Sequence, residues 1–246
     1  MDLTAALIVI IFVTAFAALM QAAVGFGFAV VVTPLLSLAM GAREAIALSL
    51  ILSVTLSLIL YAADQPRAPL RSIMPMFLAA TLSAPLGIYV LAVADERVLR
   101  AAIGIAVLSS VVGTLWMPHA TEERPERLLT TIGVGLASGL MRGATSMGGP
   151  PVVLYEHWRG ATPMDIRRRL VAFFALTGVT GVLMAGGIGV FTPSLWLLSL
   201  GGLPSVAIAI YGGRYIRPRI SDLWFRRISM ALLVFMGVVS LLGALR

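Results

Sequence analysis

Long stretches without a charged residue alternate with short charged clusters along this chain. The uncharged stretches cover residues 3–42, 45–63, 72–94, 101–121 and 170–213. Each is long enough for at least one helix of about 20 residues, the length needed to cross the apolar core of a bilayer. The pattern therefore predicts an all-α polytopic membrane protein.

Charged residues, prolines and glycines divide these stretches into about eight full spans. We place the spans near residues 3–24, 45–63, 72–94, 98–117, 128–142, 168–187, 193–212 and 226–245. Two further apolar pieces, 28–40 and 150–158, follow glycine-rich breaks. They are too short to cross a core about 30 Å thick at 1.5 Å per residue, so we interpret them as half-helices or re-entrant elements.

The chain divides into two halves of similar pattern. We expect a first repeat at 1–117, a polar linker at 118–127 and a second repeat at 128–246. Gln21 in the first half matches Arg142 in the second, and in the same register Gly27 matches Gly148. Internal repeats of this kind are typical of secondary transporters.

The arginines predict how the repeats are oriented. Two loops of the second half, within 159–169 and 214–227, are rich in arginine, whereas the connection at 187–192 has no charge. Because cytoplasmic loops carry the excess of basic residues, both arginine-rich loops should be cytoplasmic. In the first half the equivalent connection carries Arg67 and Arg71, which favours the reverse polarity. We therefore expect inverted repeats with both termini periplasmic in a bacterial inner membrane; a parallel repeat of four plus four spans is the alternative.

The composition narrows the function classes. Hydrophobic residues make up 59% of the chain and charged residues 12%, against about 25% charged residues in an ordinary soluble domain. All 18 basic residues are arginine, and we interpret the net charge of +7 as membrane topology rather than nucleic-acid binding. Cysteine is absent and the two histidines are isolated, so we expect no metal and no cofactor.

Enzymatic motifs are missing from the sequence. No serine, histidine and acidic residue form a recognisable nucleophile arrangement, and no phosphate-binding loop is present. We expect a transporter rather than an enzyme. An intramembrane enzyme is the weaker alternative.

Two glycine-rich breaks are the candidate substrate site. Irregular backbone at membrane depth persists only where protein or a water-filled cavity satisfies its polar groups. The candidate substrate-binding residues at the breaks are Gly25, Gly27, Thr145, Ser146, Gly148 and Gly149, and the candidate gating or helix-break residues are Phe26, Phe28, Pro150 and Pro151. Prolines suit the first turn of a helix, whose free N–H groups would point back at the break and attract an anion. The alternative is that the glycines permit close helix packing or simple turns.

Arg142 is the sharpest single candidate, because it stands just before the second break in a stretch otherwise uncharged from Leu128 to Tyr155. A guanidinium cannot deprotonate to escape an apolar medium, so it needs a counter-anion, carbonyl groups or water. We expect Arg142 to supply the main positive charge for an anionic substrate and Gln21 to orient that substrate. The alternative is that Arg142 extends to the interface or braces helix ends.

These motifs resemble the sulfite exporter TauE/SafE family, also described as 4-toluene sulfonate uptake permeases. The resemblance covers essentially the whole chain and rests on the segment 21–27, on Pro34-Leu35, and above all on the segment 146–155, Ser-Met-Gly-Gly-Pro-Pro-Val-Val-Leu-Tyr. It implies the transport of sulfur-containing anions such as sulfite or organosulfonates. Arg142 departs from the family pattern, in which small residues are common at this place.

Together these observations predict a carrier with a site near the middle of the bilayer that opens alternately to each side. Export of an anion is favoured by a negative cell interior, and the spans contain no obvious carboxylate for a proton relay. We therefore expect an exporter whose partners are a small anion and the lipid bilayer. The alternatives are an anion channel and an uptake permease coupled to protons; assembly as a homodimer stays open.

Overall fold

In the computed structural model the described residues are 3–24, 26–63, 66–115, 124–216, 234–235 and 237–244. They fold into helices and contain no strand. The elements in chain order are α1 (Leu3–Val24), α2 (Phe28–Met40), α3 (Ala42–Ala63), α4 (Leu70–Val93), α5 (Glu96–Leu115), α6 (Leu128–Thr145), α7 (Gly149–Trp158), α8 (Pro163–Gly187) and α9 (Pro193–Ile216). Residues 237–244 are also helical.

The segments predicted as spans between residues 3 and 212, and both short pieces, are helices with small shifts of boundary. The largest shift is at α8, which begins at Pro163 rather than at 168, because the Thr162 side chain accepts a hydrogen bond from the Asp165 backbone and starts the helix before its arginines. Helix α6 continues through Arg142 to Thr145. Half of the span predicted at 226–245 lies outside the described residues, as do residues 118–123 of the predicted linker and the candidate residue Gly25.

The described residues include helices that are suited to a bilayer. Helices α3, α4 and α8 are long and apolar enough to cross a membrane, and Ile10–Ala22 and Phe28–Met40 are shorter apolar helices. Large apolar side chains such as Phe12, Leu82 and Leu129 are exposed on the outside. Such a surface suits lipid rather than water as the surrounding solvent.

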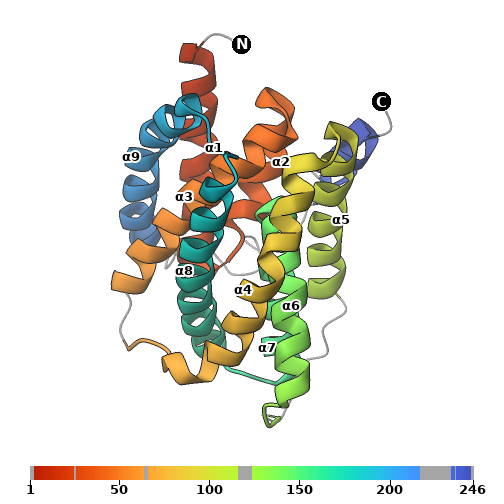
Figure 1. The fold of residues 1–246 in the computed structure, drawn as a ribbon. Helices are drawn as coiled ribbons and strands as arrows, with labels where there is room; N and C mark the ends of the chain where they lie inside the picture. The colour runs from red at the N-terminus through yellow and green to blue at the C-terminus, as the bar shows by residue number, and fades with distance from the viewer. Residues whose placement is uncertain are drawn as a thin grey trace.

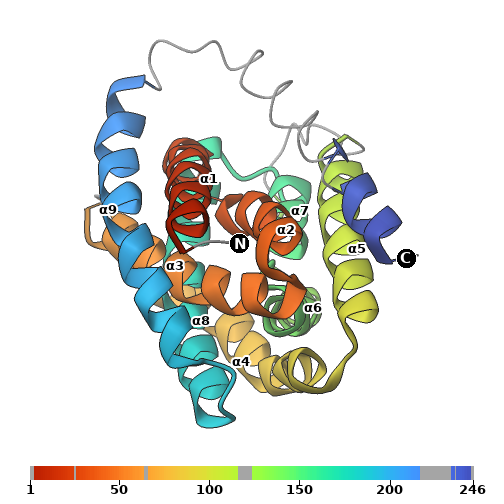
Figure 2. The ribbon, with the colours of Figure 1, turned by 90° about the horizontal axis from the view of Figure 1, so that it is seen from above.

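Each half of the chain packs one of its helices against a helix of the other half. Helix α4 packs along α6, and α1 packs along α9, so in each half the first helix contacts the fourth helix of the other half. Helix α1 runs downwards from the N-terminus in Figure 1, whereas α6 begins at the lower end and runs upwards. Viewed from above, α9 and α5 lie on opposite sides, with α2 and α3 between them (Figure 2).

The contact between α4 and α6 is closest at glycines. A Cβ added at Gly143 would lie 2.6 Å from the Ala84 carbonyl oxygen, and one added at Gly139 would overlap the Ala80 carbonyl oxygen. Glycine therefore lets the two backbones meet, as is common between membrane helices. This contact joins the first half of the chain firmly to the second and holds the end of α6 in the interior.

Candidate functional site

Both predicted breaks are real interruptions of helices. Helix α1 ends at Val24 and α2 begins at Phe28, with Gly27 in a left-handed conformation at φ 109°. Helix α6 ends at Thr145 and α7 begins at Gly149, with Ser146 in a left-handed conformation at φ 66°. A left-handed conformation is unfavourable for serine, so the surrounding structure must impose it.

The two breaks lie next to each other in the interior. A Cβ added at Gly149, the first residue of α7, would lie 3.6 Å from the Phe26 ring of the first break. The same Cβ would lie 3.3 Å from the Phe174 ring of α8. Phe26 and Phe174 therefore lie against the start of α7, where the two breaks meet.

Arg142 is buried at this meeting point. It is 5% exposed, its Nη2 lies 3.4 Å from Ser53 Oγ of α3, and its Cζ lies 5.8 Å from the centre of the Phe174 ring. Its Nε has no hydrogen-bond partner in the described part of the chain. No acidic side chain pairs with Arg142 among the described residues. The guanidinium thus retains donor capacity and a positive charge for a ligand.

Glycines on α8 make room for this long side chain. A Cβ at Gly178 would lie 3.0 Å from Arg142 Nη2, and one at Gly181 would lie 3.9 Å from Arg142 Nε. The Arg142 side chain therefore passes α8 at Gly178 and Gly181 and contacts α3 at Ser53.

Gln21 bridges the first break. It is 3% exposed; its Oε1 accepts a hydrogen bond from Phe28 N at 3.2 Å, and its Nε2 donates one to Ser57 Oγ at 3.2 Å. The side-chain carbonyl of Gln21 thus accepts from a backbone N–H in the first turn of α2. The first N–H groups of a helix have no partner within the helix itself. Gln21 occupies the same position one turn before the end of α1 as Arg142 does in α6.

Three buried serines of α3 face these residues, and we call them the hydroxyl face. They stand at four-residue intervals, so they lie on one side of the helix. Ser49 accepts a hydrogen bond from Thr33 of α2 at 2.8 Å, Ser53 contacts Arg142, and Ser57 accepts from Gln21. The hydroxyl face was not among the residues predicted from the sequence, although three serines at this spacing in an apolar span are a detectable signal.

The two hydroxyl residues of the second break, Thr145 and Ser146, differ in their hydrogen bonding. Thr145 Oγ1 donates to the Met141 carbonyl at 2.7 Å and accepts from Met147 N, so it caps the end of α6. Ser146 Oγ is buried and has no hydrogen-bond partner among the residues that the structure describes. Gly148 allows close approach, because a Cβ there would lie 2.9 Å from the Arg142 Cβ. Within the described residues, Ser146 therefore keeps its hydroxyl unbonded at the end of α6, whereas Thr145 does not.

The candidate gating residues differ in how deeply they are buried. Phe28 is fully buried in the core cluster that contains Val32, Leu36 and Leu48, whereas Phe26 is half-buried. Pro150 and Pro151 stand in the first turn of α7, as expected from the sequence. Phe26 lies against Gly149 at the second break, whereas Phe28 packs in the core of the first half.

A charge network joins α7 to the helices around it. Arg159 lies 3.0 Å from Glu126 and 3.2 Å from Glu156, and Arg169 lies 2.7 Å from Glu126 and 2.8 Å from Glu156. Arg169 also donates to the Ser72 carbonyl at 3.3 Å. The Glu156 side chain is 1% exposed. The network thus ties the last turn of α7 to α8, to the segment before α6 and to the start of α4.

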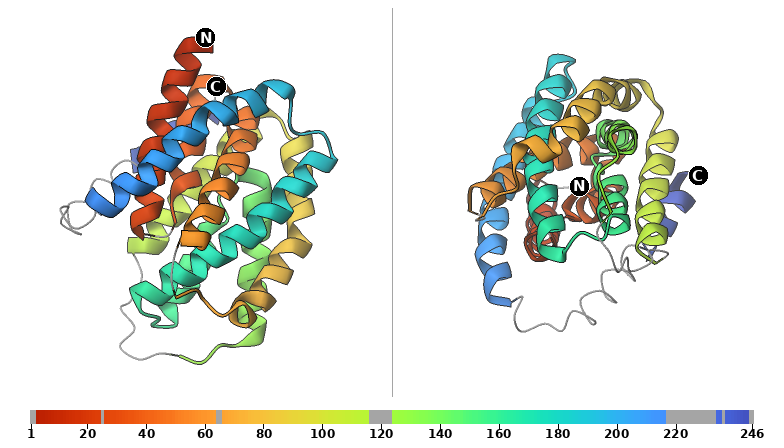
Figure 3. Two further views of the ribbon diagram at one scale, coloured as in Figure 1. Left: turned by 90° about the vertical axis from the view of Figure 1, so that its left-hand side faces the viewer. Right: turned by 90° about the horizontal axis from the view of Figure 1, so that it is seen from below.

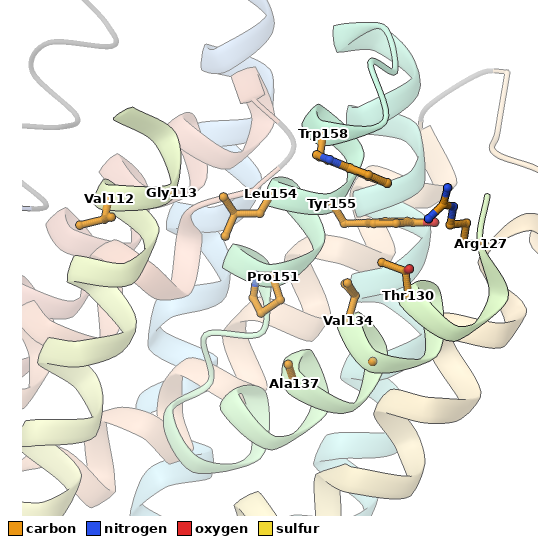
Figure 4. A pocket seen from close by; sticks show the side chains of 11 residues that line it. Val112, Gly113, Arg127, Thr130, Val134, Ala137, Pro151, Leu154, Tyr155 and Trp158 are labelled. Atoms are coloured by element: carbon orange, nitrogen blue, oxygen red, sulfur yellow. The ribbon is translucent and has the colours of Figure 1, made fainter. Parts of the chain in front are cut away.

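An open groove of about 620 Å³ lies between α5, α6 and α7 (Figure 4). Leu154 and Val112 line it, and Arg127 and Trp158 stand near one end. Arg142 does not line this groove. An apolar lining with a single charged residue suits an apolar chain better than a small anion with several charged oxygens.

The described residues contain no cluster of histidine, aspartate and glutamate able to hold a metal ion. The polar groups at the breaks are instead a guanidinium, an amide and several hydroxyls. This set offers mainly hydrogen-bond donors, which are suited to an oxyanion.

Comparison with known proteins places the chain in a family. Residues 10–240 match the family described as Sulfite exporter TauE/SafE. A protein of Cupriavidus necator named as a probable sulfite/organosulfonate exporter TauE is 26% identical over 111 residues, which cover 45% of this chain and 43% of that protein. No solved structure matches. This chain belongs to the sulfite exporter TauE/SafE family, a family of membrane transporters, and is a multi-pass membrane protein.

Proposed function

We propose that this protein is a secondary transporter that exports small sulfur-containing oxyanions, such as sulfite or organosulfonates. Its site is the space between the two helix breaks, with Arg142 as the charged wall. The observation that carries the proposal is the burial of Arg142 without an acidic partner in the described residues. Burying an unpaired charge in a protein interior costs on the order of several kcal/mol, so a counter-anion would be bound favourably.

The depth of the site fits alternating access. Arg142 reaches Ser53, which stands close to the middle of α3 (Ala42–Ala63), one of the helices long enough to cross a membrane. A site at this depth is near the bilayer midplane. Substrate sites of transporters with repeated halves lie at that depth, between the repeats.

The arrangement of the halves supports an inverted repeat. Helices α1 and α6 run in opposite directions, and each packs against the fourth helix of the other half. We propose that access alternates when one half moves against the other around Arg142. The parallel repeat would require α1 and α6 to run in the same direction.

The orientation follows from the arginines. The start of α1 and the helix 237–244 lie towards the upper end of the molecule, and the starts of α6 and α8 lie at the lower end (Figure 1; Figure 3, left). The first two turns of α8 carry Arg167, Arg168 and Arg169. Because basic residues collect on the cytoplasmic side, we place the lower end in the cytoplasm and both termini in the periplasm of a bacterial inner membrane.

Export is the direction that the membrane potential supports. Outward movement of one negative charge is favoured by about 2.3 kcal/mol per 100 mV with a negative interior. The acidic residue nearest the breaks along α7, Glu156, is held by Arg159 and Arg169. A proton-coupled uptake permease would need a carboxylate released from such partners.

Counterflow into proteoliposomes tests the proposal. Vesicles preloaded with unlabelled sulfite or sulfoacetate should accumulate the labelled anion transiently, with saturation. Arg142→Lys and Arg142→Gln should abolish this uptake, whereas Arg127→Gln, which removes a cation outside the site, should not. Currents far above carrier turnover would instead favour an anion channel. Full activity of both Arg142 variants would remove Arg142 from the site.

A further inference from the structure

We propose that anions reach Arg142 from the cytoplasm along one face of α8, with Arg167 as the receiving cation and Phe174 as the side chain that closes the route. The inference rests on the proposed function, which places the substrate at Arg142, and on the orientation proposed with it. Neither Arg167 nor Phe174 is among the site residues predicted from the sequence.

One face of α8 runs along the first break and the Arg142 side chain. Residues spaced alternately by four and three positions lie on the same side of a helix. In α8 this face consists of Arg167, Val171, Phe174, Gly178 and Gly181. Val171 belongs to the core cluster that contains Phe28 of α2, and the two glycines lie against the Arg142 side chain. The face therefore leads from the start of α8 to the proposed substrate site.

Arg167 is the charged residue of this face and contacts the end of α1. It is half-buried, and its Nη2 donates a hydrogen bond to the Ala22 carbonyl at 3.3 Å. Ala22 directly follows Gln21 in the last turn of α1. A guanidinium carries five N–H donors in a planar fork and can bind a carbonyl and an oxyanion together. Arg167 therefore places a positive charge beside the first break, at the lower end of α8 in Figure 1.

The two arginines that follow Arg167 have other partners. Arg168 lies 3.5 Å from the exposed Asp165. Arg169 belongs to the charge network of α7. Neither stands on the face of α8 that runs along the first break, so Arg168 offers a matched control for Arg167.

Phe174 lies between Arg167 and the guanidinium of Arg142. It stands about 10 Å along the helix axis from Arg167 and about 6 Å before Gly178, at 1.5 Å per residue. Its ring centre is 5.8 Å from Arg142 Cζ, and a Cβ added at Gly149 would lie 3.3 Å from its Cζ. Phe174 is 6% exposed. The ring thus covers the cytoplasmic side of the guanidinium and lies against the start of α7.

The route is closed in this structure. Phe26 also lies against Gly149, and Val171 is 1% exposed, so apolar side chains fill the face between Arg167 and Arg142. An anion cannot cross such a layer without losing its hydration at a high cost. Because Phe174 belongs to α8 and Gly149 to α7, a small movement between these helices would separate the ring from α7 and open the face.

The test measures access to the site with a single thiol, because the chain has no cysteine of its own. Ser53→Cys places the thiol beside Arg142 in the full chain. Inside-out and right-side-out vesicles are treated with two impermeant thiosulfonate reagents of similar size, one bearing a sulfonate and one a trimethylammonium group. We expect the sulfonate reagent to react faster from the cytoplasmic side.

Arg167→Gln tests the receiving cation. Glutamine keeps an N–H donor for the Ala22 carbonyl but removes the charge. From the cytoplasmic side, the ratio of sulfonate to trimethylammonium labelling should fall about threefold or more, because a positive charge at an entrance concentrates anions. The ratio from the periplasmic side should not change. Arg168→Gln should leave both ratios unchanged, and an equal fall in the two variants would overturn the assignment of Arg167.

Phe174→Ala tests the closure. Both reagents should label the thiol several-fold faster from the cytoplasmic side, and Phe174→Leu, which also lacks the ring, should act in the same direction if the alanine variant does not fold. Phe191→Ala removes a ring beside Gly186, towards the other end of α8, and should leave the rates unchanged. Unchanged labelling in both Phe174 variants would overturn the route, and faster labelling from the periplasmic side alone would overturn the route and the proposed orientation.

Labelling does not require transport, so the inference and the proposed function fail separately. Counterflow by the unmodified protein without the labelling pattern overturns this inference and leaves the proposed function standing. Absence of counterflow of sulfite and sulfoacetate in the unmodified protein overturns the proposed function.

Discussion

Arg142 of α6 and Ser53 of α3 meet in the interior of the bundle, with Nη2 3.4 Å from Oγ, although the two residues belong to different halves of the chain. The contact is long for a charge-assisted hydrogen bond, which is usually about 2.7–2.9 Å. Arg142 is therefore held loosely by the protein. A ligand that takes over its donors competes with a weak contact rather than a strong ion pair.

The first consequence is a trade between stability and transport. Arg142→Gln removes a buried charge that lacks an acidic partner in the described residues, so we expect the free energy of unfolding to rise by about 1–3 kcal/mol while transport is lost. Thermal unfolding in detergent and counterflow would measure the two effects on the same preparation. A variant that loses both stability and transport would show that Arg142 braces the helices instead.

Gly178 sets the space available to Arg142. An added Cβ would lie 3.0 Å from Nη2 and 2.8 Å from Val54, so Gly178→Ala should displace the guanidinium from Ser53. We expect sulfite affinity to fall about tenfold or more, since charged hydrogen bonds contribute about 1.5–3 kcal/mol. Binding calorimetry measures this change.

The matched control is Gly133→Ala in α6, where an added Cβ would meet nothing within 4 Å. This substitution should preserve affinity and stabilise the helix by up to about 1 kcal/mol. A similar loss of affinity in both variants would point to a general effect on the fold.

The sequence predicted the order of the helices, because charges and glycines interrupt apolar runs wherever a helix ends. It also predicted both breaks and the burial of Arg142. It could not predict that Gln21 caps α2 or that Thr145 caps α6, since each role depends on a hydrogen bond whose partner is fixed only by the folded backbone. The hydroxyl face was not predicted because serine is common in membrane helices. Only the four-residue spacing of these three serines distinguishes them from the others.

The two glutamates of the charge network should contribute unequally to the free energy of unfolding, because Glu156 is buried and Glu126 is partly exposed. Glu156→Gln would leave two largely buried arginines with only Glu126 as a charged partner in the network, so we expect a loss of about 3–5 kcal/mol in the free energy of unfolding. Glu126 is 35% exposed, and Glu126→Gln should cost much less, because water and Glu156 compensate the arginines. Chemical denaturation of both variants measures the difference. Equal losses would show that the burial of Glu156 does not govern the network.

Gln21 offers a way to separate folding from binding. Gln21→Glu keeps an oxygen that can accept the hydrogen bond from Phe28 N, so the start of α2 stays capped, but it loses the donor to Ser57 Oγ and places a negative charge in the site. We expect anion affinity to fall by about tenfold or more, because a like charge is costly where the dielectric constant is low. Gln21→Leu leaves the Phe28 N–H unsatisfied and should lower the free energy of unfolding by about 1–3 kcal/mol. Unfolding curves together with sulfite binding for both variants measure the two effects, and undiminished affinity in Gln21→Glu would place Gln21 outside the path of the anion.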